Sequence, residues 1–240
     1  MAEWSSLSEA ILEQNLQLFQ QLIQSEDIDI NLDEETGEIP LILVTVSGQL
    51  DMAKLLLLHK DIRVNEVDMF GCSAFFCCCA EAQNEAVKLL QKDSRLDVNL
   101  GQNEGATPFY VACQEGNFDI VRQLLRNPDV DVNKSMKKGE SPLFVACQCG
   151  RLDIIKWMFA SDRDIDLNQA SNKQLALDYA IQNQYEKDVL LYQKATSDFV
   201  SPIDAARIME FDQIIELIEA FEANPTLMRE KLRKDMYYYG

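Results

Sequence analysis

The apolar residues of this chain fall into pairs of short clusters with helical spacing, and a polar arm follows each pair. The best preserved unit is residues 105–133, GATPFYVACQEGNFDIVRQLLRNPDVDVN. Its second cluster contains Phe118, Ile120, Val121, Leu124 and Leu125. Because these positions share one face of a helix, a helix is predicted from about Phe118 to Arg126.

The first cluster of the same unit predicts a shorter helix. Thr107 can cap a helix through its hydroxyl oxygen, and Pro108 suits the first helical position, where no backbone N–H is needed. This helix is expected to run from Pro108 to Gln114, and Gly116 then permits a tight reversal. The arm DVDVN and the loop after it are predicted to be extended backbone and a turn, so each unit consists of two helices and a projecting loop.

The unit recurs along the chain. Five similar arms end in asparagines spaced 34, 34, 34 and 35 residues apart, at Asn31, Asn65, Asn99, Asn133 and Asn168. A glycine lies six residues after each of the first four, at Gly37, Gly71, Gly105 and Gly139. The column of Leu124 holds Leu22, Leu56, Leu90 and Met158, and the column of Val121 holds Phe19, Ala53, Val87 and Ile155. One such unit cannot bury its apolar faces alone, so the units are expected to stack around a shared core.

The spacing predicts an array of about seven helix pairs over residues 1–222. Its expected parts are an N-terminal cap at 5–38, central units at 39–72, 73–106, 107–140 and 141–174, a degraded unit at 175–200, and a C-terminal cap at 201–222. Ser6 and Glu9 can form a capping box at the first helix. Residues 223–240 are predicted to add a helix and tail, with Asn224 as cap and Pro225 at the first position. That helix either seals the last pair or binds something else, through Leu227, Met228, Leu232 and Met236.

The units resemble those of the ankyrin-repeat family. The family pattern T-P-L-H-x-A, followed by a glycine-led second helix, is similar to TPFYVACQEGNFDIVRQLL and SPLFVACQCGRLDIIKWMF, which begin at Thr107 and Ser141. A period of 34 also suits tetratricopeptide repeats, but their tryptophan-led pattern does not occur. The resemblance implies an all-α ankyrin-repeat solenoid of stacked helix-turn-helix units with projecting loops or short β-hairpins. The motif histidine is replaced by Ile42, Phe76, Tyr110, Phe144 and Asp178, so its hydrogen bonding is expected to be lost or replaced.

Three consecutive cysteines, in the run SAFFCCCAEA at residues 73–82, raise the question of a metal or redox site. Cys77 aligns with Val111 and Val145, Cys78 with Ala112 and Ala146, and Cys79 with Cys113 and Cys147. Small apolar residues in these columns favour a buried core. Neighbours on a helix point about 100° apart and cannot converge on a metal, and equivalent residues of stacked helices lie about 8–10 Å apart, too far for a disulfide. No metal or cofactor site is predicted, and the unpaired spacing of the seven cysteines favours reduced thiols in the cytoplasm, with the nucleus as the alternative.

Charge limits the partners further. The net charge of −18 disfavours nucleic-acid binding, because phosphate backbones require a basic surface. No apolar run is long enough to cross a membrane, and no secretory signal begins the sequence. Residues 1–39 hold ten acidic residues and no lysine or arginine, which is either a solvated face or a steering surface for a partner protein with a basic surface. The chain is expected to be monomeric.

The resemblance implies a non-catalytic scaffold or adaptor that binds a partner protein on a concave face of loop tips and first helices. The positions of this face are Glu35, Glu38, Met69, Phe70, Asn103, Glu104, Gln114, Glu115, Lys137, Lys138, Glu140 and Gln148. A regulatory or inhibitory subunit of an enzyme is the alternative. Catalysis is disfavoured because the sequence has one histidine, no phosphate-binding glycine loop and no nucleophile elbow. Met69 and Phe70 are the only apolar pair at a tip, and they are either tucked onto a neighbouring loop or exposed for a partner.

Overall fold

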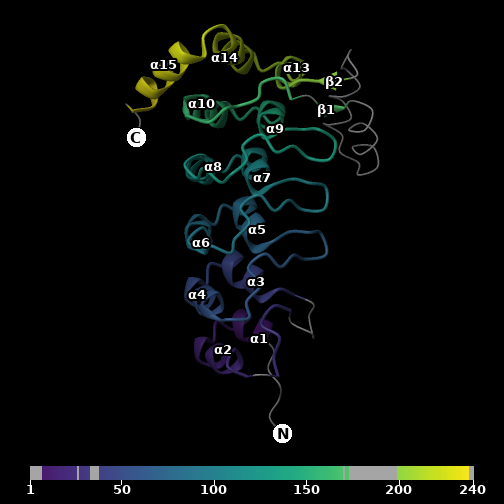
Figure 1. Ribbon diagram of the computed structural model, residues 1–240, viewed down its shortest axis with the longest axis vertical. Helices are drawn as coiled ribbons and strands as arrows, with labels where there is room; N and C mark the ends of the chain where they lie inside the picture. The colour runs from purple at the N-terminus through teal and green to yellow at the C-terminus, as the bar shows by residue number, and fades with distance from the viewer. Residues whose placement is uncertain (1–6, 26, 33–37, 170, 173–198, 238–240) are drawn as a thin grey trace. The chain divides into compact units, whose positions relative to one another are not determined.

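The computed structural model describes residues 7–25, 27–32, 38–169, 171–172 and 199–237 (Figure 1). Within these ranges the chain forms thirteen α-helices and one two-stranded β-ladder. The chain divides into two compact units, residues 1–103 and 104–240. None of the described helices is long and apolar enough to span a bilayer.

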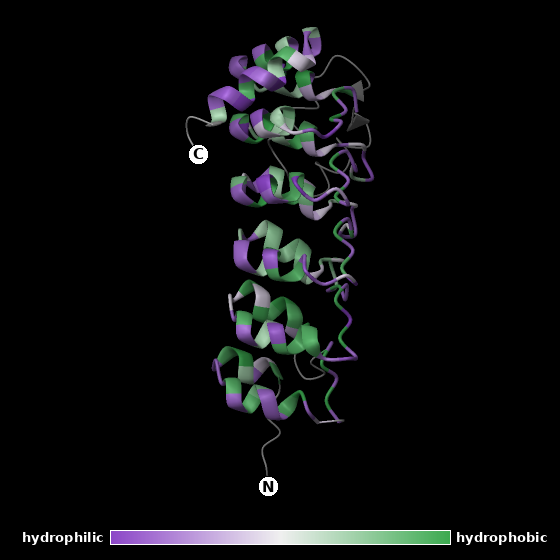
Figure 2. Ribbon diagram, turned by 60° about the vertical axis from the view of Figure 1, so that its left-hand side comes forward, coloured by the Kyte–Doolittle hydropathy of each residue, from purple (hydrophilic) through white to green (hydrophobic). Residues whose placement is uncertain are grey.

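The first unit is built from three helix pairs. They are α1 (Leu7–Leu12) with α2 (Leu16–Leu22), α3 (Pro40–Val46) with α4 (Leu50–Leu58), and α5 (Ala74–Ala80) with α6 (Asn84–Leu90). Each first helix packs on the next first helix and each second helix on the next second helix. Within this unit, as in the other, the apolar residues coloured green in Figure 2 gather on the helix pairs and the polar residues along the loops.

The second unit contains the best preserved repeats. Its helices are α7 (Pro108–Glu115), α8 (Phe118–Leu125), α9 (Pro142–Gln148), α10 (Leu152–Ala160), α13 (Pro202–Ile208), α14 (Asp212–Ala223) and α15 (Pro225–Tyr237). The bounds of α7 and α8 agree with the sequence prediction to within one residue at each end. Gly116 has a φ of 85°, the left-handed conformation that the reversal between them requires.

Helix starts follow the capping chemistry expected from the sequence. The Thr107 hydroxyl accepts a hydrogen bond from the Tyr110 N–H, as predicted, and Ser73 and Ser141 cap α5 and α9 in the same way. Ser201 and Asp204 form a full capping box at the start of α13. The capping box proposed for Ser6 and Glu9 requires Ser6, which lies outside the described residues.

The core includes the two columns that the repeat singles out. The side chains in the column of Val121 are buried, and so are those in the column of Leu124, with the exception of Leu22, which is half-buried. The aromatic residues Phe75 and Phe109 add buried area on the first helices. Apolar burial of this kind supplies most of the favourable free energy of folding.

Two sets of side-chain hydrogen bonds join successive helix pairs and repeat with the period of the sequence. At the turn between the two helices, Gln49 Nε2 donates to the Ile11 carbonyl and Gln83 Nε2 to the Val46 carbonyl, both at 2.8 Å. In the second unit Arg151 donates to the Gln114 carbonyl from the equivalent position. These bonds satisfy carbonyls that the end of a helix would otherwise leave unpaired.

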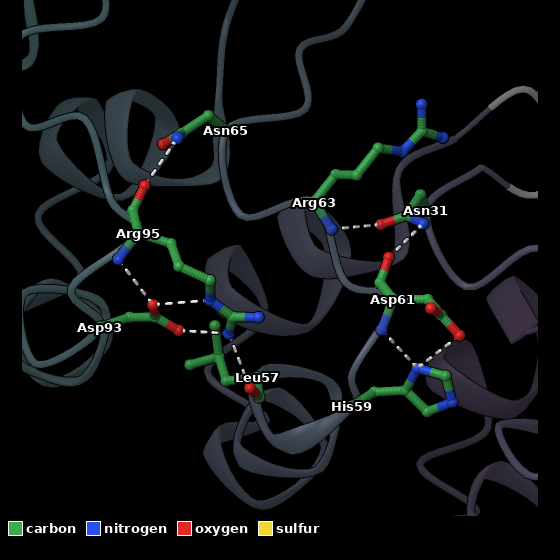
Figure 3. A network of polar contacts seen from close by, with 8 residues as sticks. All are labelled: Asn31, Leu57, His59, Asp61, Arg63, Asn65, Asp93 and Arg95. Atoms are coloured by element: carbon green, nitrogen blue, oxygen red, sulfur yellow. Dashed lines mark hydrogen bonds and ion pairs between the residues drawn. The ribbon is translucent and has the colours of Figure 1, made fainter.

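The arm asparagines form the second set (Figure 3). Asn31 donates through Nδ2 to the Asp61 carbonyl at 3.1 Å and accepts through Oδ1 from the Arg63 N–H at 2.7 Å. The same two bonds join Asn65 to Arg95 and Asp97, and Asn133 to Asp164 and Asp166. The asparagine of the repeated DxN sequence therefore joins neighbouring arms by hydrogen bonds. This structural role accounts for the regular spacing of the sequence.

Near the C-terminus, helices that are far apart in the sequence pack on one another. A helix pair was expected within residues 175–200, which lie outside the described residues except for the last two. The next pair in sequence, α13 and α14, packs directly on α9 and α10. The small buried residues Ala205 and Ala206 allow this close approach of α13. The predicted C-terminal cap therefore lies against the fifth predicted pair in space. The degraded unit at 175–200 stays a prediction.

A short ladder joins two segments that are separated by 26 residues in the sequence, between Asn172 and Phe199. Strand β1 (Ser171–Asn172) pairs antiparallel with β2 (Phe199–Val200), with Ser171 opposite Val200 and Asn172 opposite Phe199. The two ends of the intervening segment are therefore held side by side.

The last helix, α15, covers the end of the second unit. The Leu227 N–H donates to Asn224 Oδ1 at 3.0 Å, which confirms Asn224 as the cap. α15 packs on α10 and α14, and Leu232 is buried in this contact. Arg233 Nε donates to the Ala160 carbonyl at 2.8 Å and fastens the helix to the end of α10. The sequence left open whether this helix seals the last helix pair or binds something else. In the structure α15 packs on that pair, and Leu227 stays exposed.

Candidate protein-binding surface

The tip formed by residues 67–72 is a rigid turn built around Asp68. Its Oδ1 accepts from the Phe70 N–H at 2.9 Å and from the Cys72 N–H at 2.8 Å. The Asp68 backbone carbonyl accepts from the Gly71 N–H, and its own N–H donates to the Cys72 carbonyl. A single bridge between Val67 and Ser73 closes the turn. Four hydrogen bonds and this bridge therefore hold the backbone of the tip.

Asn103, at the next tip of the same unit, binds the backbone carbonyls of Met69 and Phe70. The Asn103 N–H donates to the Phe70 carbonyl, and Asn103 Nδ2 donates to the Met69 carbonyl, each at 3.0 Å. A Cβ atom on Gly71 would lie 2.5 Å from Asn103 Oδ1, so the two tips are in close contact. Met69, Phe70 and Asn103 are thus brought together, as the sequence prediction required of a shared face.

The side chains of Met69 and Phe70 point away from this clamp. Met69 is 85% exposed and Phe70 is 65% exposed, and Val67 beside them is also exposed. Because the backbone is already held, a partner that covers these side chains has to immobilise their rotamers but does not have to order the loop. Of the two arrangements open from the sequence, the structure has the exposed one.

The tip of residues 136–140 in the second unit repeats this backbone geometry. The Lys137 N–H donates to the Glu104 carbonyl at 3.0 Å, one repeat along from the bond between Asn103 and Phe70. The Met136 N–H donates to the Glu140 carbonyl, and the Gly139 N–H donates to the Met136 carbonyl. Lys137 is exposed and Glu104 is half-buried. The backbone hydrogen bond between successive tips therefore recurs in both units, whereas the side chains at the two tips differ in kind.

Two predicted surface residues are not at the surface. Lys138 Nζ and Glu140 Oε2 form an ion pair at 2.9 Å, with only 8% and 2% of their side chains exposed. The Tyr110 hydroxyl donates to the same Glu140 oxygen at 3.0 Å. A buried charge is stable only when it is paired and hydrogen-bonded, and both conditions hold here. The interpretation of Lys138 and Glu140 as exposed tip residues is therefore wrong.

The structure describes four other candidate positions. Glu38 is exposed directly before α3, and Glu35 lies outside the described residues. Gln114 and Glu115 are exposed at the C-terminal end of α7, a helix length of about 12 Å from the tip that precedes it. Gln148 is half-buried at the end of α9.

The cysteine run is packed largely as predicted. Cys78, Cys79, Cys113 and Cys147 are buried, but Cys77 is only half-buried, so its match to the buried Val111 column is incomplete. Burial raises the pKa of Cys78 to about 11, and burial together with the nearby Cys72 and Asp68 raises the pKa of Cys77 to about 12. Burial also raises the pKa of Cys79, Cys113 and Cys147. A thiol held in its neutral form is a poor nucleophile and a poor metal ligand.

The single histidine has a structural position. His59 Nδ1 accepts from the Asp61 N–H at 3.2 Å in the turn after α4 (Figure 3). Nearby, hydrogen bonds from Arg95 lower the pKa of the Asp93 carboxyl. Within the described parts of the chain, no three His, Cys, Asp or Glu side chains are grouped so as to hold a metal ion.

Comparison with known proteins gives one matching family. The model for ankyrin repeats in three copies matches residues 7–101, 61–136, 94–171 and 129–198, which overlap from residue 7 to residue 198. The chain belongs to the ankyrin-repeat family. No curated protein matches the chain. Ankyrin repeats are general protein-interaction modules, and the all-α ankyrin solenoid expected from the sequence is confirmed.

A solved ankyrin structure supports the fold. The crystal structure of an ankyrin repeat domain from Acinetobacter baumannii AYE, determined at 1.00 Å resolution, is 19% identical with a TM-score of 0.69. The match covers 89% of this chain and 96% of that chain. At this identity the similarity concerns the fold alone.

The structure shows how one replacement of the motif histidine behaves. Tyr110 stands in the column of the ankyrin histidine, and its hydroxyl binds Glu140 of the next tip. Hydrogen bonding in this column is therefore replaced at this repeat. Asp68 and Val67 were also missed at the other tip. An Asp three residues before Gly is typical of a turn and was an available signal for Asp68.

Proposed function

We propose that this ankyrin-repeat protein is a non-catalytic binding module whose principal contact is the tip of Val67, Met69 and Phe70. The observation that carries the proposal is the exposure of Met69 and Phe70 on a backbone held by Asp68 and Asn103. Aromatic and methionine side chains are enriched at the centres of protein interfaces. A partner with an apolar pocket gains their burial without having to order the loop first.

The charge around this anchor supports a partner protein with a basic surface. The chain has 40 acidic and 22 basic residues, and the exposed Glu38 belongs to the same unit as the tip. Opposite potentials speed the encounter of two proteins more than they tighten the final complex. In this proposal the apolar tip supplies affinity, and the acidic surface supplies a faster association.

Photo-crosslinking at the tip tests the proposal. A benzophenone amino acid is placed at position 69, the crosslinked protein is identified by mass spectrometry, and its affinity is then measured directly. We expect Phe70→Ala to leave the melting temperature nearly unchanged and to weaken binding by at least about 1 kcal/mol, as loss of an important interface aromatic does.

The matched control is Leu58→Ala. Leu58 is 82% exposed at the end of α4 and outside the tip, so this substitution also removes a largely exposed apolar side chain. Leu58→Ala should leave the affinity unchanged. Equal loss with both variants, or a marked fall in stability with Phe70→Ala while binding persists, would remove the tip from the interface.

A further inference from the structure

Residues of the helices α8, α10 and α15 of the second unit line an open groove of about 810 Å³. Its charged lining consists of Arg122, Arg126, Arg163 and Arg233, together with one carboxylate, Asp162. The apolar lining includes Trp157 and Met236. We call this site the arginine groove. Four arginines at one place are unexpected in a chain with a net charge of −18.

Two of the arginines hold the walls of the groove together. Arg163 donates to the Asn127 carbonyl at 2.6 Å and also to the Val130 carbonyl. Arg233 donates to Asp162 and to the Ala160 carbonyl, so the only carboxylate of the lining is already paired. These contacts fix the positions of the arm after α8 and of α15.

The other two arginines are available to a ligand. Arg122 lies with its guanidinium 5.7 Å from the centre of the Trp157 ring, and Phe118 packs on the edge of the same ring at 5.8 Å. Arg126 follows one helical turn later and is exposed. No ion pair joins either of them to a carboxylate of the described residues. Arginine presents a planar fork of donors that matches a carboxylate with two hydrogen bonds.

A neighbouring groove of about 750 Å³ extends the site, because it shares Arg122, Trp157 and Met236 with the first. It adds the basic residues Arg151 and Lys156 and the acidic residues Asp153 and Asp235. This extension is electrically balanced, so the positive charge is concentrated beside Trp157. The apolar ring therefore lies between a basic region and a mixed one.

We propose that the arginine groove binds an acidic peptide segment that carries a large apolar side chain between its carboxylates. The apolar side chain lies against Trp157 and Met236, and the flanking carboxylates bind Arg122 and Arg126. Free phosphate would use the arginines but not the apolar wall, so a peptide uses more of the site. A single-stranded nucleic acid can stack a base on Trp157, but the net charge of −18 opposes its phosphate backbone. The groove is lined by residues of the second unit, whereas Val67, Met69 and Phe70 belong to the first unit, so this proposal rests on other residues than the one above.

The simpler explanation is that Arg122 and Arg126 only complement the negative end of the α8 dipole. That role predicts an effect on stability and none on ligand binding. A test must therefore measure binding and stability in the same variants.

The test uses the full chain with Trp4→Phe, which leaves Trp157 as the only tryptophan. The probe is the acetylated peptide EDELFDEDE, titrated while the fluorescence of Trp157 is recorded. We expect saturable binding with a change in Trp157 emission. Arg122→Gln with Arg126→Gln should weaken binding at least about tenfold, since charge-assisted bonds are lost at both positions.

Controls separate the site from general electrostatics. Lys60→Gln with Lys92→Gln changes the net charge by the same amount at exposed positions of the other unit, and it should leave the affinity within about twofold. The peptide EDEGGDEDE should bind at least about tenfold more weakly, because it cannot fill the apolar wall. No binding up to millimolar peptide, equal weakening by both double variants, or equal binding of inorganic phosphate or single-stranded DNA would overturn the proposal.

Discussion

Asn103 holds the Met69 and Phe70 carbonyls from the neighbouring tip, and this contact makes Gly71 a sensitive position. Gly71 has a φ of +78°, and an added Cβ would lie 2.5 Å from Asn103 Oδ1. Gly48 has a similar φ of +73°, but nothing lies within 4 Å of the site of its Cβ. The two glycines therefore differ in crowding and not in backbone conformation.

We expect Gly48→Ala to lower the free energy of unfolding by about 1–2 kcal/mol, the cost of a left-handed alanine. Gly71→Ala should cost more, because it adds the clash with Asn103, and it should release the tip. Urea unfolding measures the first effect, and amide hydrogen exchange at Met69 and Phe70 measures the second. Equal destabilisation by both changes would mean that the two tips do not constrain each other.

Cys78 gives a second prediction at this scale. Burial raises its pKa from 9.0 to about 11, so the unfolded state loses this proton first as the pH rises. The stabilising contribution of the neutral thiol is fully present below pH 9.0 and is lost progressively toward pH 11.

The stability difference between the native protein and Cys78→Ala, measured by urea unfolding, should therefore shrink between pH 9.0 and about 11. Cys149→Ala is the control, because Cys149 is exposed. A difference that does not change with pH would show that Cys78 titrates as an ordinary thiol.

The ion pair of Lys138 and Glu140 shows where residue-level reasoning from sequence stops. Lys138 and Glu140 lie on either side of the tip glycine Gly139, and polar residues at a loop tip are expected to be exposed to solvent. Their burial depends on Tyr110, which lies 30 residues away in the chain and supplies the hydrogen bond to Glu140. Phe70, in the column of Lys138, has no such partner and stays outside.

At the scale of the helices, the repeat columns make a quantitative prediction. Leu124 is fully buried in the second unit, and Leu124→Ala should lower stability by about 2–5 kcal/mol, as large-to-small changes in a core do. Leu22 occupies the same column but is half-buried in the first pair, so Leu22→Ala should cost less. Chemical unfolding of the two variants, followed by circular dichroism, measures the difference.

A further control is Leu90→Ala, since Leu90 is as buried as Leu124 but belongs to the first unit. It should resemble Leu124→Ala. If Leu22→Ala proved as damaging as both, position within the array would not matter, contrary to the behaviour of repeat proteins.

Helix positions were predictable because each depends on a few adjacent residues. Thr107 and Pro108 mark the start of α7, and Gly116 marks its end. The packing of α13 on α9 was not predictable, because it depends on where the chain returns after Asn172, and no local pattern encodes that return. The arginine groove was missed for the same reason, since α8 and α15 are separated by about a hundred residues.

Considered as a whole molecule, the chain has a net charge of −18, which repels itself in the compact state. Raising the ionic strength from about 0.01 M to about 0.15 M shortens the Debye length from about 30 Å to about 8 Å. We expect the melting temperature to rise by a few degrees over this range, measured by differential scanning calorimetry. An uncharged osmolyte at equal osmolality is the control for non-electrostatic effects.

The buried pair of Lys138 and Glu140 should be insensitive to this screening, whereas exposed pairs such as Lys54 with Asp51 should weaken. A melting temperature that falls with salt would mean that exposed ion pairs outweigh the general repulsion.

The ladder of β1 and β2 has a consequence for how such a chain can change over generations. Asn172 and Phe199 are opposite one another, so the stack of α9 with α13 does not depend on the length of the peptide that joins them. Loop-closure entropy rises only slowly with length, by about 0.6 kcal/mol for each doubling. Insertions and deletions at this point are therefore tolerated far better than at the tips. This is the place where a lineage can acquire a new segment while its helix pairs keep their contacts.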